Sequence, residues 1–134
     1  MAAQKNTDRH EYRLRVSPEF DELEQVHRTV VLCETTREFA SFRYELGVEE
    51  EVSGTTLKYR ITGLKAPQLS LPDSGPAYFR RSYTGLNGAI EILIEGLDKR
   101  TTSFVFDVTP TSVTLTSQPR ESFVSVSTEP EHPS

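Results

Sequence analysis

The chain has 134 residues, of which 35% are hydrophobic and 26% are charged, and its formal net charge is −5. This length predicts a single domain, large enough to hold a core without disulfides or a structural metal. Interleaved charges with an acidic balance argue against a nucleic-acid-binding surface.

No apolar run approaches the ~20 residues of a membrane-spanning helix. The first residues also lack the apolar stretch of a signal peptide. We therefore expect a cytoplasmic protein, provided that no leader has been removed.

Two short polar segments flank the predicted domain. Residues 1–9 are mostly polar, and residues 128–134 carry two prolines and two glutamates. Neither composition suits a strand within a sheet. We expect flexible tails at 1–9 and 128–134, with one all-β domain over residues 10–127.

The first predicted elements are a strand and a short helix. Residues 11–16 alternate between apolar and charged side chains, which is typical of a half-buried strand. Ser17 and Pro18 then match a helix cap and first helical position, and acidic residues follow in the first turn. The sequence therefore predicts a short helix over 18–28, with an ordered acidic loop as the alternative.

Three strands are predicted next, over residues 29–35, 39–52 and 55–64. A turn at 35–37 would join the first two, although two registers fit there. A turn at Ser53-Gly54 would join the last two, with Val48 opposite Tyr59 and Leu46 opposite Ile61. Cys33, the only cysteine, lies in an apolar run beside acidic residues, so we expect a small core residue rather than a reactive thiol.

A proline-rich connection over residues 65–76 separates these strands from a later group. The later group spans residues 78–126, and its first turn is Asn87-Gly88, a strong two-residue hairpin signal. Folding there places Tyr83 opposite Ile92 and Phe79 opposite Gly96. Further turns at 98–100, 110–111 and 119–120 complete a five-stranded antiparallel meander. One face of this meander would then carry Phe79, Tyr83, Ile90, Ile92, Ile94, Phe104, Phe106, Val108, Val113, Leu115, Val124 and Val126.

The expected fold is thus all-β, with about nine antiparallel strands in hairpin order. The proline-rich connection favours a crossing between the two sheets of a β-sandwich. The unbroken hairpin order favours the alternative, a closed up-and-down β-barrel.

Arg81 is the most unusual residue, because the register places it on the apolar face between Phe79 and Tyr83. A buried guanidinium needs a carboxylate or several carbonyl partners. At a barrel mouth it would instead bind an anionic group, and near a sheet end it would extend to water. The candidate ligand-binding residues are Arg81, Tyr83, Phe79, Tyr59 and Tyr44.

The opposite face of the same meander is also unusually apolar. The predicted registers place Leu93, Val105 and Phe123 in one row across it. A sheet face that meets only water is normally polar. This row is therefore a candidate interface, covered by Leu69 and Leu71 of the proline-rich connection, by the predicted helix, or by another protein chain.

Catalytic and metal-binding patterns are not found in the sequence. The acidic run 49–51 lacks the spacing of a calcium loop, and no two of the three histidines have metal-ligand spacing. There is no nucleophile elbow and no glycine-rich phosphate loop. We therefore expect no enzyme activity, no cofactor and no metal.

Two functions remain as expectations. The first is a non-catalytic β-domain that acts as a protein-interaction or self-assembly module. The second is a barrel that binds a small apolar or anionic ligand, with Arg81 as internal anchor. The length and the strand–helix–strands order resemble intracellular lipid-binding barrels in outline, without a shared motif.

Overall fold

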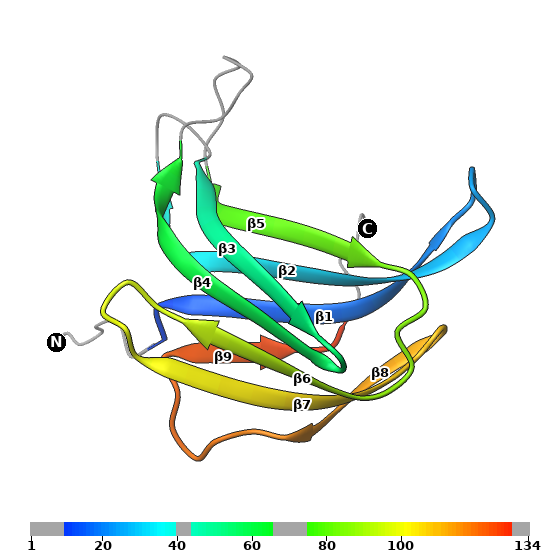
Figure 1. Ribbon diagram of the computed structural model, residues 1–134. Helices are drawn as coiled ribbons and strands as arrows, with labels where there is room; N and C mark the ends of the chain where they lie inside the picture. Colours follow the sequence, from blue (N-terminus) through cyan, green and yellow to red (C-terminus); the bar gives the residue numbers. More distant parts are fainter. Residues whose placement is uncertain (1–9, 40–43, 66–74, 130–134) are drawn as a thin grey trace, which may run out of the picture.

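The computed structural model describes residues 10–39, 44–65 and 75–129. These residues form nine β-strands and no helix (Figure 1), so the all-β prediction is confirmed. None of them belongs to a helix that would be long and apolar enough to cross a membrane. Apart from residues 128 and 129, the two predicted tails lie outside the described residues, as do Leu69 and Leu71.

The strands have the following bounds: β1 Tyr12–Asp21, β2 Val26–Phe39, β3 Glu45–Ser53, β4 Thr56–Lys65, β5 Gly75–Tyr83, β6 Gly88–Glu95, β7 Thr101–Thr109, β8 Ser112–Ser117 and β9 Val124–Ser127.

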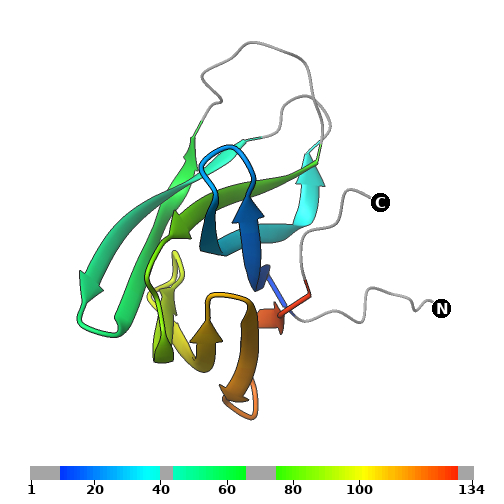
Figure 2. The same ribbon diagram turned by 90° about the vertical axis from the view of Figure 1, so that its right-hand side faces the viewer.

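All nine strands belong to one sheet, in the order β8-β7-β6-β4-β3-β5-β2-β1-β9. Figures 1 and 2 show this sheet curled around its core into a half-barrel. Three neighbouring pairs, β1–β9, β3–β5 and β4–β6, are parallel. The fold is therefore a mixed, curled sheet in place of the expected antiparallel sandwich or closed barrel.

The helix predicted over 18–28 does not form. These residues complete β1 and β2, with Phe20 opposite His27 and a tight turn between the strands. β9 ends opposite Arg15, so Pro18 lies where β1 has become an edge strand, a position that tolerates proline. The Asp21 carboxylate accepts hydrogen bonds from the amides of Leu23 and Glu24. It therefore stabilises a hairpin turn rather than a first helical turn.

The hairpin predicted at Asn87-Gly88 is also wrong. β5 pairs with β2 and β3, whereas β6 pairs with β4 and β7. Tyr83 consequently lies opposite Thr29, and Phe79 opposite Cys33. The Asn87-Gly88 signal describes only a few residues. The pairing of β5 and β6 depends instead on the strands that flank each of them in the sheet.

The predicted turn at 35–37 is replaced by continuous strand, because β2 runs through these residues. β2 pairs with both β1 and β5, and the register of the β2–β5 pair shifts between Glu34 and Glu38. The turn predicted at 119–120 does not pair β8 with β9, since β9 instead lies parallel to β1.

Two predicted pairings are confirmed. β3 and β4 form the hairpin at Ser53-Gly54, although Val48 lies opposite Ile61 rather than Tyr59. β6, β7 and β8 form an antiparallel meander in chain order.

The core lies inside the curl and contains the inward face predicted for the later strands. Phe79, Ile90, Ile92, Ile94, Phe104, Phe106, Val108 and Val124 are buried there, and Tyr83, Val113, Leu115 and Val126 pack against them. Each fully buried side chain of this kind stabilises the fold by about 1.5–3 kcal/mol.

Candidate functional site

The structure opens between β3 and β5, near most of the predicted ligand-binding residues. These parallel strands share one pair, Glu45 with Tyr78, and then diverge (Figure 1). A cavity of about 380 Å³ lies at this divergence, lined in part by Leu46, Val48, Phe79 and Arg81. We call it the β3–β5 cleft.

Arg81 lies at the rim of this cleft. It is opposite Val31, which is fully buried, so both residues belong to the inner face of the sheet. Its Nε donates to Glu50 Oε1 at 3.0 Å, and its Nη1 donates to the Arg80 carbonyl at 3.0 Å. The guanidinium also lies 5.6 Å from the centre of the Phe79 ring. These partners stabilise an inward-facing cation whose side chain is 37% exposed.

Glu50 links Arg81 to two tyrosines. The Tyr83 hydroxyl donates to Glu50 Oε2, and the hydroxyls of Tyr59 and Tyr83 are 2.5 Å apart. Burial, followed by the hydrogen bond to Glu50, raises the pKa of Tyr83 to about 12. Burial also raises the pKa of Tyr59. We call Glu50, Tyr59, Arg81 and Tyr83 the rim network.

The rim network joins β3 to β5 where their backbones no longer pair. Its tyrosines stay protonated at neutral pH, so they are poor general bases. Because Glu50 compensates the charge of Arg81, an anionic ligand would compete with that carboxylate. Tyr44 lies outside this network, and its carbonyl accepts from the Tyr78 amide at 3.2 Å.

The predicted outer row is not continuous. Leu93 and Val105 are partly exposed on neighbouring strands β6 and β7. Phe123 is only 6% exposed and packs edge-on against Tyr12, with ring centres 6.3 Å apart. The pairing of β9 with β1 turns Phe123 toward the core.

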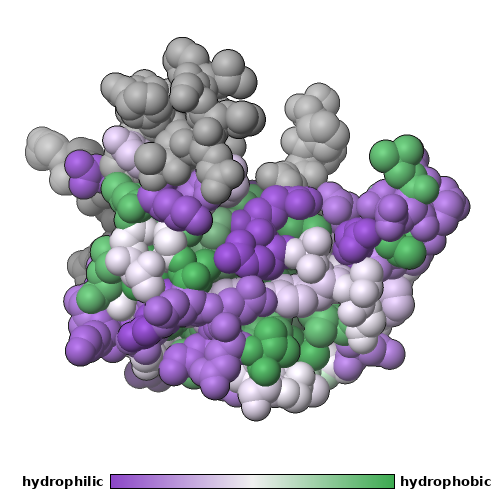
Figure 3. Space-filling model, turned by 45° about the horizontal axis from the view of Figure 1, so that its top comes forward, coloured by the Kyte–Doolittle hydropathy of each residue, from purple (hydrophilic) through white to green (hydrophobic). Residues whose placement is uncertain are grey.

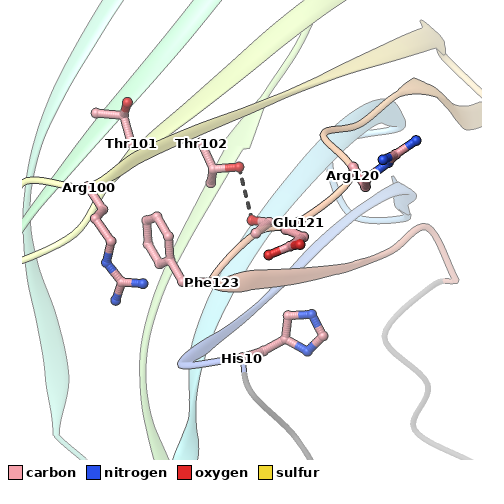
Figure 4. A pocket seen from close by; sticks show the side chains of 8 residues that line it. His10, Arg100, Thr101, Thr102, Arg120, Glu121 and Phe123 are labelled. Carbon is pink, nitrogen blue, oxygen red and sulfur yellow. Dashed lines mark hydrogen bonds between the residues drawn. The ribbon is translucent and has the colours of Figure 1, made fainter.

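A second cavity, of about 640 Å³, was not predicted from the sequence. Figure 4 shows His10, Arg100, Thr102, Arg120 and Glu121 around it, contributed by three separate parts of the chain. The parallel pairing of β9 with β1 brings these parts together, and no local sequence signal indicates it.

Charge compensation limits what this second cavity can bind. Arg100 forms ion pairs with Glu11 and Asp98 and lies 4.7 Å from the centre of the Phe123 ring. Glu121 adds a further negative charge. The cavity therefore lacks the cationic excess that an anion-binding site needs.

The described residues contain no group of three or more His, Cys, Asp or Glu side chains that would hold a metal ion. Cys33 is fully buried, and burial, with a smaller contribution from Glu34, raises the pKa of its thiol. A buried, protonated thiol is neither a nucleophile nor a metal ligand.

The most exposed large apolar residue in the described part of the chain, Leu23, lies on an extension of β1 and β2, residues 18–28, which we call the arm. β9 ends opposite Arg15 and β5 ends opposite Thr29, so the two strands of the arm pair only with each other. Figure 1 shows the arm projecting from the sheet at the upper right. Its Leu23 is 97% exposed and its Phe20 is 45% exposed.

The arm has its own stabilising contacts. Asp21 Oδ1 accepts from the amides of Leu23 at 3.0 Å and Glu24 at 3.1 Å. Arg28 pairs with Asp21 at 3.4 Å and with Glu24 at 3.7 Å. The hydrogen bond from the Glu24 amide is the main cause that lowers the pKa of Asp21. These contacts stabilise the turn.

Comparisons with protein-family models, with curated proteins and with solved structures find no match to this chain.

Proposed function

We propose that this chain is a non-catalytic interaction module that docks on a partner protein through its arm. The observation that carries the proposal is Leu23, 97% exposed at the end of a projecting hairpin. Figure 3 shows apolar surface on this projection, surrounded by hydrophilic surface.

A single exposed leucine is ordinary on a protein surface. What distinguishes Leu23 is the ordered turn that presents it. Asp21 accepts two turn amides, and the Phe20 ring packs on His27 with centres 4.7 Å apart. Because the turn is already ordered, docking loses less conformational entropy than it would with a flexible loop.

The base of the arm is fixed to the sheet. Glu19 accepts from Arg80 of β5 at 2.9 Å, which limits movement of the arm relative to the half-barrel. The arm therefore presents its apolar tip in a defined direction.

The charges near the tip indicate the chemistry of the partner. Asp21, Glu22 and Glu24 surround Leu23, and Arg28 is the one basic residue that pairs with them in the described part of the chain. A complementary partner surface would be an apolar pocket rimmed by lysine or arginine side chains.

The ligand-binding alternative has less support. Arg81, its proposed anchor, is paired with Glu50. Tyr59, Phe104 and Phe106 fill the interior of the curl with fully buried side chains. For these reasons the arm carries the proposal rather than the interior.

Site-specific photo-crosslinking tests the proposal. A photoreactive amino acid is placed at position 23 and, in a matched control, at Leu97, which is 61% exposed in another turn. Irradiation in an extract of the producing cells is expected to give a discrete protein adduct from position 23 alone. Adducts of equal yield from both positions, or none from either, would contradict docking through the arm.

A charge variant tests the predicted partner surface. Glu22→Lys combined with Glu24→Lys is expected to reduce the adduct at position 23 several-fold, because the basic rim of the partner would repel the altered tip. An adduct of unchanged yield would rule out the basic rim.

A further inference from the structure

We infer that the outer edge of β8 is the surface through which two copies of this chain associate. The two β8 strands would pair antiparallel about a two-fold axis at Thr114, and so join the two curled sheets into one. This inference does not rest on the arm.

The first argument is that β8 has a free edge. It stands at one end of the sheet and pairs with β7 alone, and Figure 1 shows it at the lower margin of the curl. Apart from this ladder, no hydrogen bond uses the backbone of residues 112–117 within the described part of the chain. Unpaired backbone groups of this kind are what an added strand recognises.

The hairpin geometry shows which backbone groups of β8 point away from β7. The two-residue turn at 110–111 makes Thr109 and Ser112 a hydrogen-bonded pair. Hydrogen-bonded and non-bonded pairs alternate along an antiparallel ladder, so Val113 and Leu115 direct their amides and carbonyls outward. An added strand must therefore bond to Val113 and Leu115.

A second copy of β8 has the matching pattern. When two β8 strands pair about Thr114, Val113 lies opposite the partner's Leu115, and Leu115 lies opposite the partner's Val113. Both pairs join residues with outward backbone groups, so each exchanges both backbone hydrogen bonds. Both pairs also bring together apolar side chains of the inner face, which pack against the core. A slip of one residue would place inner-face side chains opposite outer-face ones, so the register is specific.

The charge pattern of the sheet also favours a second copy. Of the nine strands in the described residues, only β8 and β9, the two ends of the sheet, contain no charged side chain. Edge strands are normally protected from pairing by charged side chains or proline. In a chain with a net charge of −5, an uncharged edge lets two copies meet with the least repulsion.

A bulge limits the length of the pairing. Bulges occur where β3 pairs with β4, with Thr62 as the extra residue, and where β7 pairs with β8, with Thr116 as the extra residue. A bulge bends the strand that carries it and interrupts the ladder. Because Thr116 follows Leu115, residues 112–115 remain regular, so the interface is short and the dimer is weak.

Sedimentation equilibrium of the full chain between ~10 µM and ~1 mM tests for this dimer. We expect a reversible equilibrium between monomer and dimer within this range, as a small interface predicts. A chain that is monomeric up to ~1 mM would overturn the inference and leave the edge to a segment of another protein. Species larger than the dimer would also overturn it, because pairing of β8 with β9 of the next copy builds an open chain of molecules.

A charge at the two-fold axis tests the register. Thr114 is exposed, lies opposite Asp107 of β7, and would face the partner's Thr114 in the dimer. Thr114→Glu should weaken the dimer by at least about fivefold, because like charges would lie directly opposite each other. Thr101→Glu is the matched control, since Thr101 is exposed on β7 opposite Glu95. Equal weakening by both variants, or by neither, would overturn the inference.

Disulfide trapping gives a second test that introduces no charge. The two Cα atoms of a non-hydrogen-bonded pair are about 4.5 Å apart, a distance that suits a disulfide. Thr114→Cys should therefore form a covalent dimer with oxidised glutathione. Ser112→Cys should not, because residue 112 lies opposite the partner's Thr116. Equal trapping of both variants, or no trapping of Thr114→Cys, would overturn the inference.

Hydrogen exchange locates the contact. The amides of Val113 and Leu115 should exchange more slowly as the concentration of the chain rises, whereas the amide of Thr114 already bonds to β7 and should not change. Leu23→Asp should leave the dimer unchanged, which separates this result from docking by the arm. Loss of the dimer in Leu23→Asp would place the contact on the arm and overturn the inference.

Discussion

The rim network shows how an inward-facing cation is stabilised within an apolar face. Arg81 alternates with Phe79 and Tyr83, as the strand periodicity predicts. Its position on the inner face could be anticipated from the sequence. Glu50, its partner, could not, because no local signal in the sequence shows that β3 lies beside β5.

Alkaline titration tests the rim network. Because the folded-state pKa of Tyr83 is about 12 and its ordinary value is 10.0, folding favours the protonated hydroxyl. This contribution to stability is fully present below pH 10.0 and is lost as the pH rises toward about 12. Near-ultraviolet absorbance should show Tyr12, Tyr59 and Tyr83 ionising above the ordinary tyrosine value of 10.0. Ionisation of Tyr59 and Tyr83 near pH 10.0, without unfolding, would contradict the network.

At the scale of elements, the acidic residues of the arm are compatible with either the first turn of a helix or the turn of a hairpin. Ser17, Pro18 and the carboxylates after them match a helix start, yet Asp21 accepts the amides of a hairpin turn. Gln25 completes this turn with a left-handed backbone, φ 59°. The deciding factor is the long pairing of β1 with β2, which a short sequence window does not reveal.

The Asp21 carboxylate should control the order of the arm. The pKa of Asp21 lies below its ordinary value of 3.8, so folding favours the ionised carboxylate. Its contribution to the stability of the arm is present above pH 3.8 and is lost as the pH falls through the folded-state pKa. Asp21→Ala should speed hydrogen exchange at the amides of Leu23 and Glu24 and leave core amides unchanged. Glu22→Ala is the control, and equal exchange in both variants would contradict this role.

Gly47 should be required at the β3–β4 bulge. A Cβ at this position would lie 2.7 Å from Thr62 Oγ1. Gly47→Ala should therefore destabilise the protein by about 1–3 kcal/mol in urea unfolding. Adding Thr62→Ala removes the clashing oxygen and should restore part of that loss. A double variant no more stable than Gly47→Ala would contradict this explanation.

For the whole molecule, alternation predicted which face each side chain occupies better than it predicted which strands are neighbours. The inward set from Phe79 to Val126 packs in or against the core, although β5, β6 and β9 have unexpected partners. Side-chain direction follows from a period of two residues within each strand. Pairing depends on competition among all strand edges, so the Asn87-Gly88 signal does not determine it.

The same distinction applies to the functional surfaces. The inner position of Arg81 could be predicted from one strand, whereas the β3–β5 cleft depends on two strands far apart in sequence. The arm was predicted as a helix because its acidic residues match a helix start, and its projection depends on where β5 and β9 end.

Docking through the arm is tested most directly by the affinity of the purified partner recovered through position 23. The partner is titrated against the native chain, Leu23→Asp and the control Leu97→Asp. Loss of one buried leucine predicts at least about tenfold weaker binding for Leu23→Asp, with native affinity for Leu97→Asp. Equal affinities for the native chain and Leu23→Asp would contradict the proposed function.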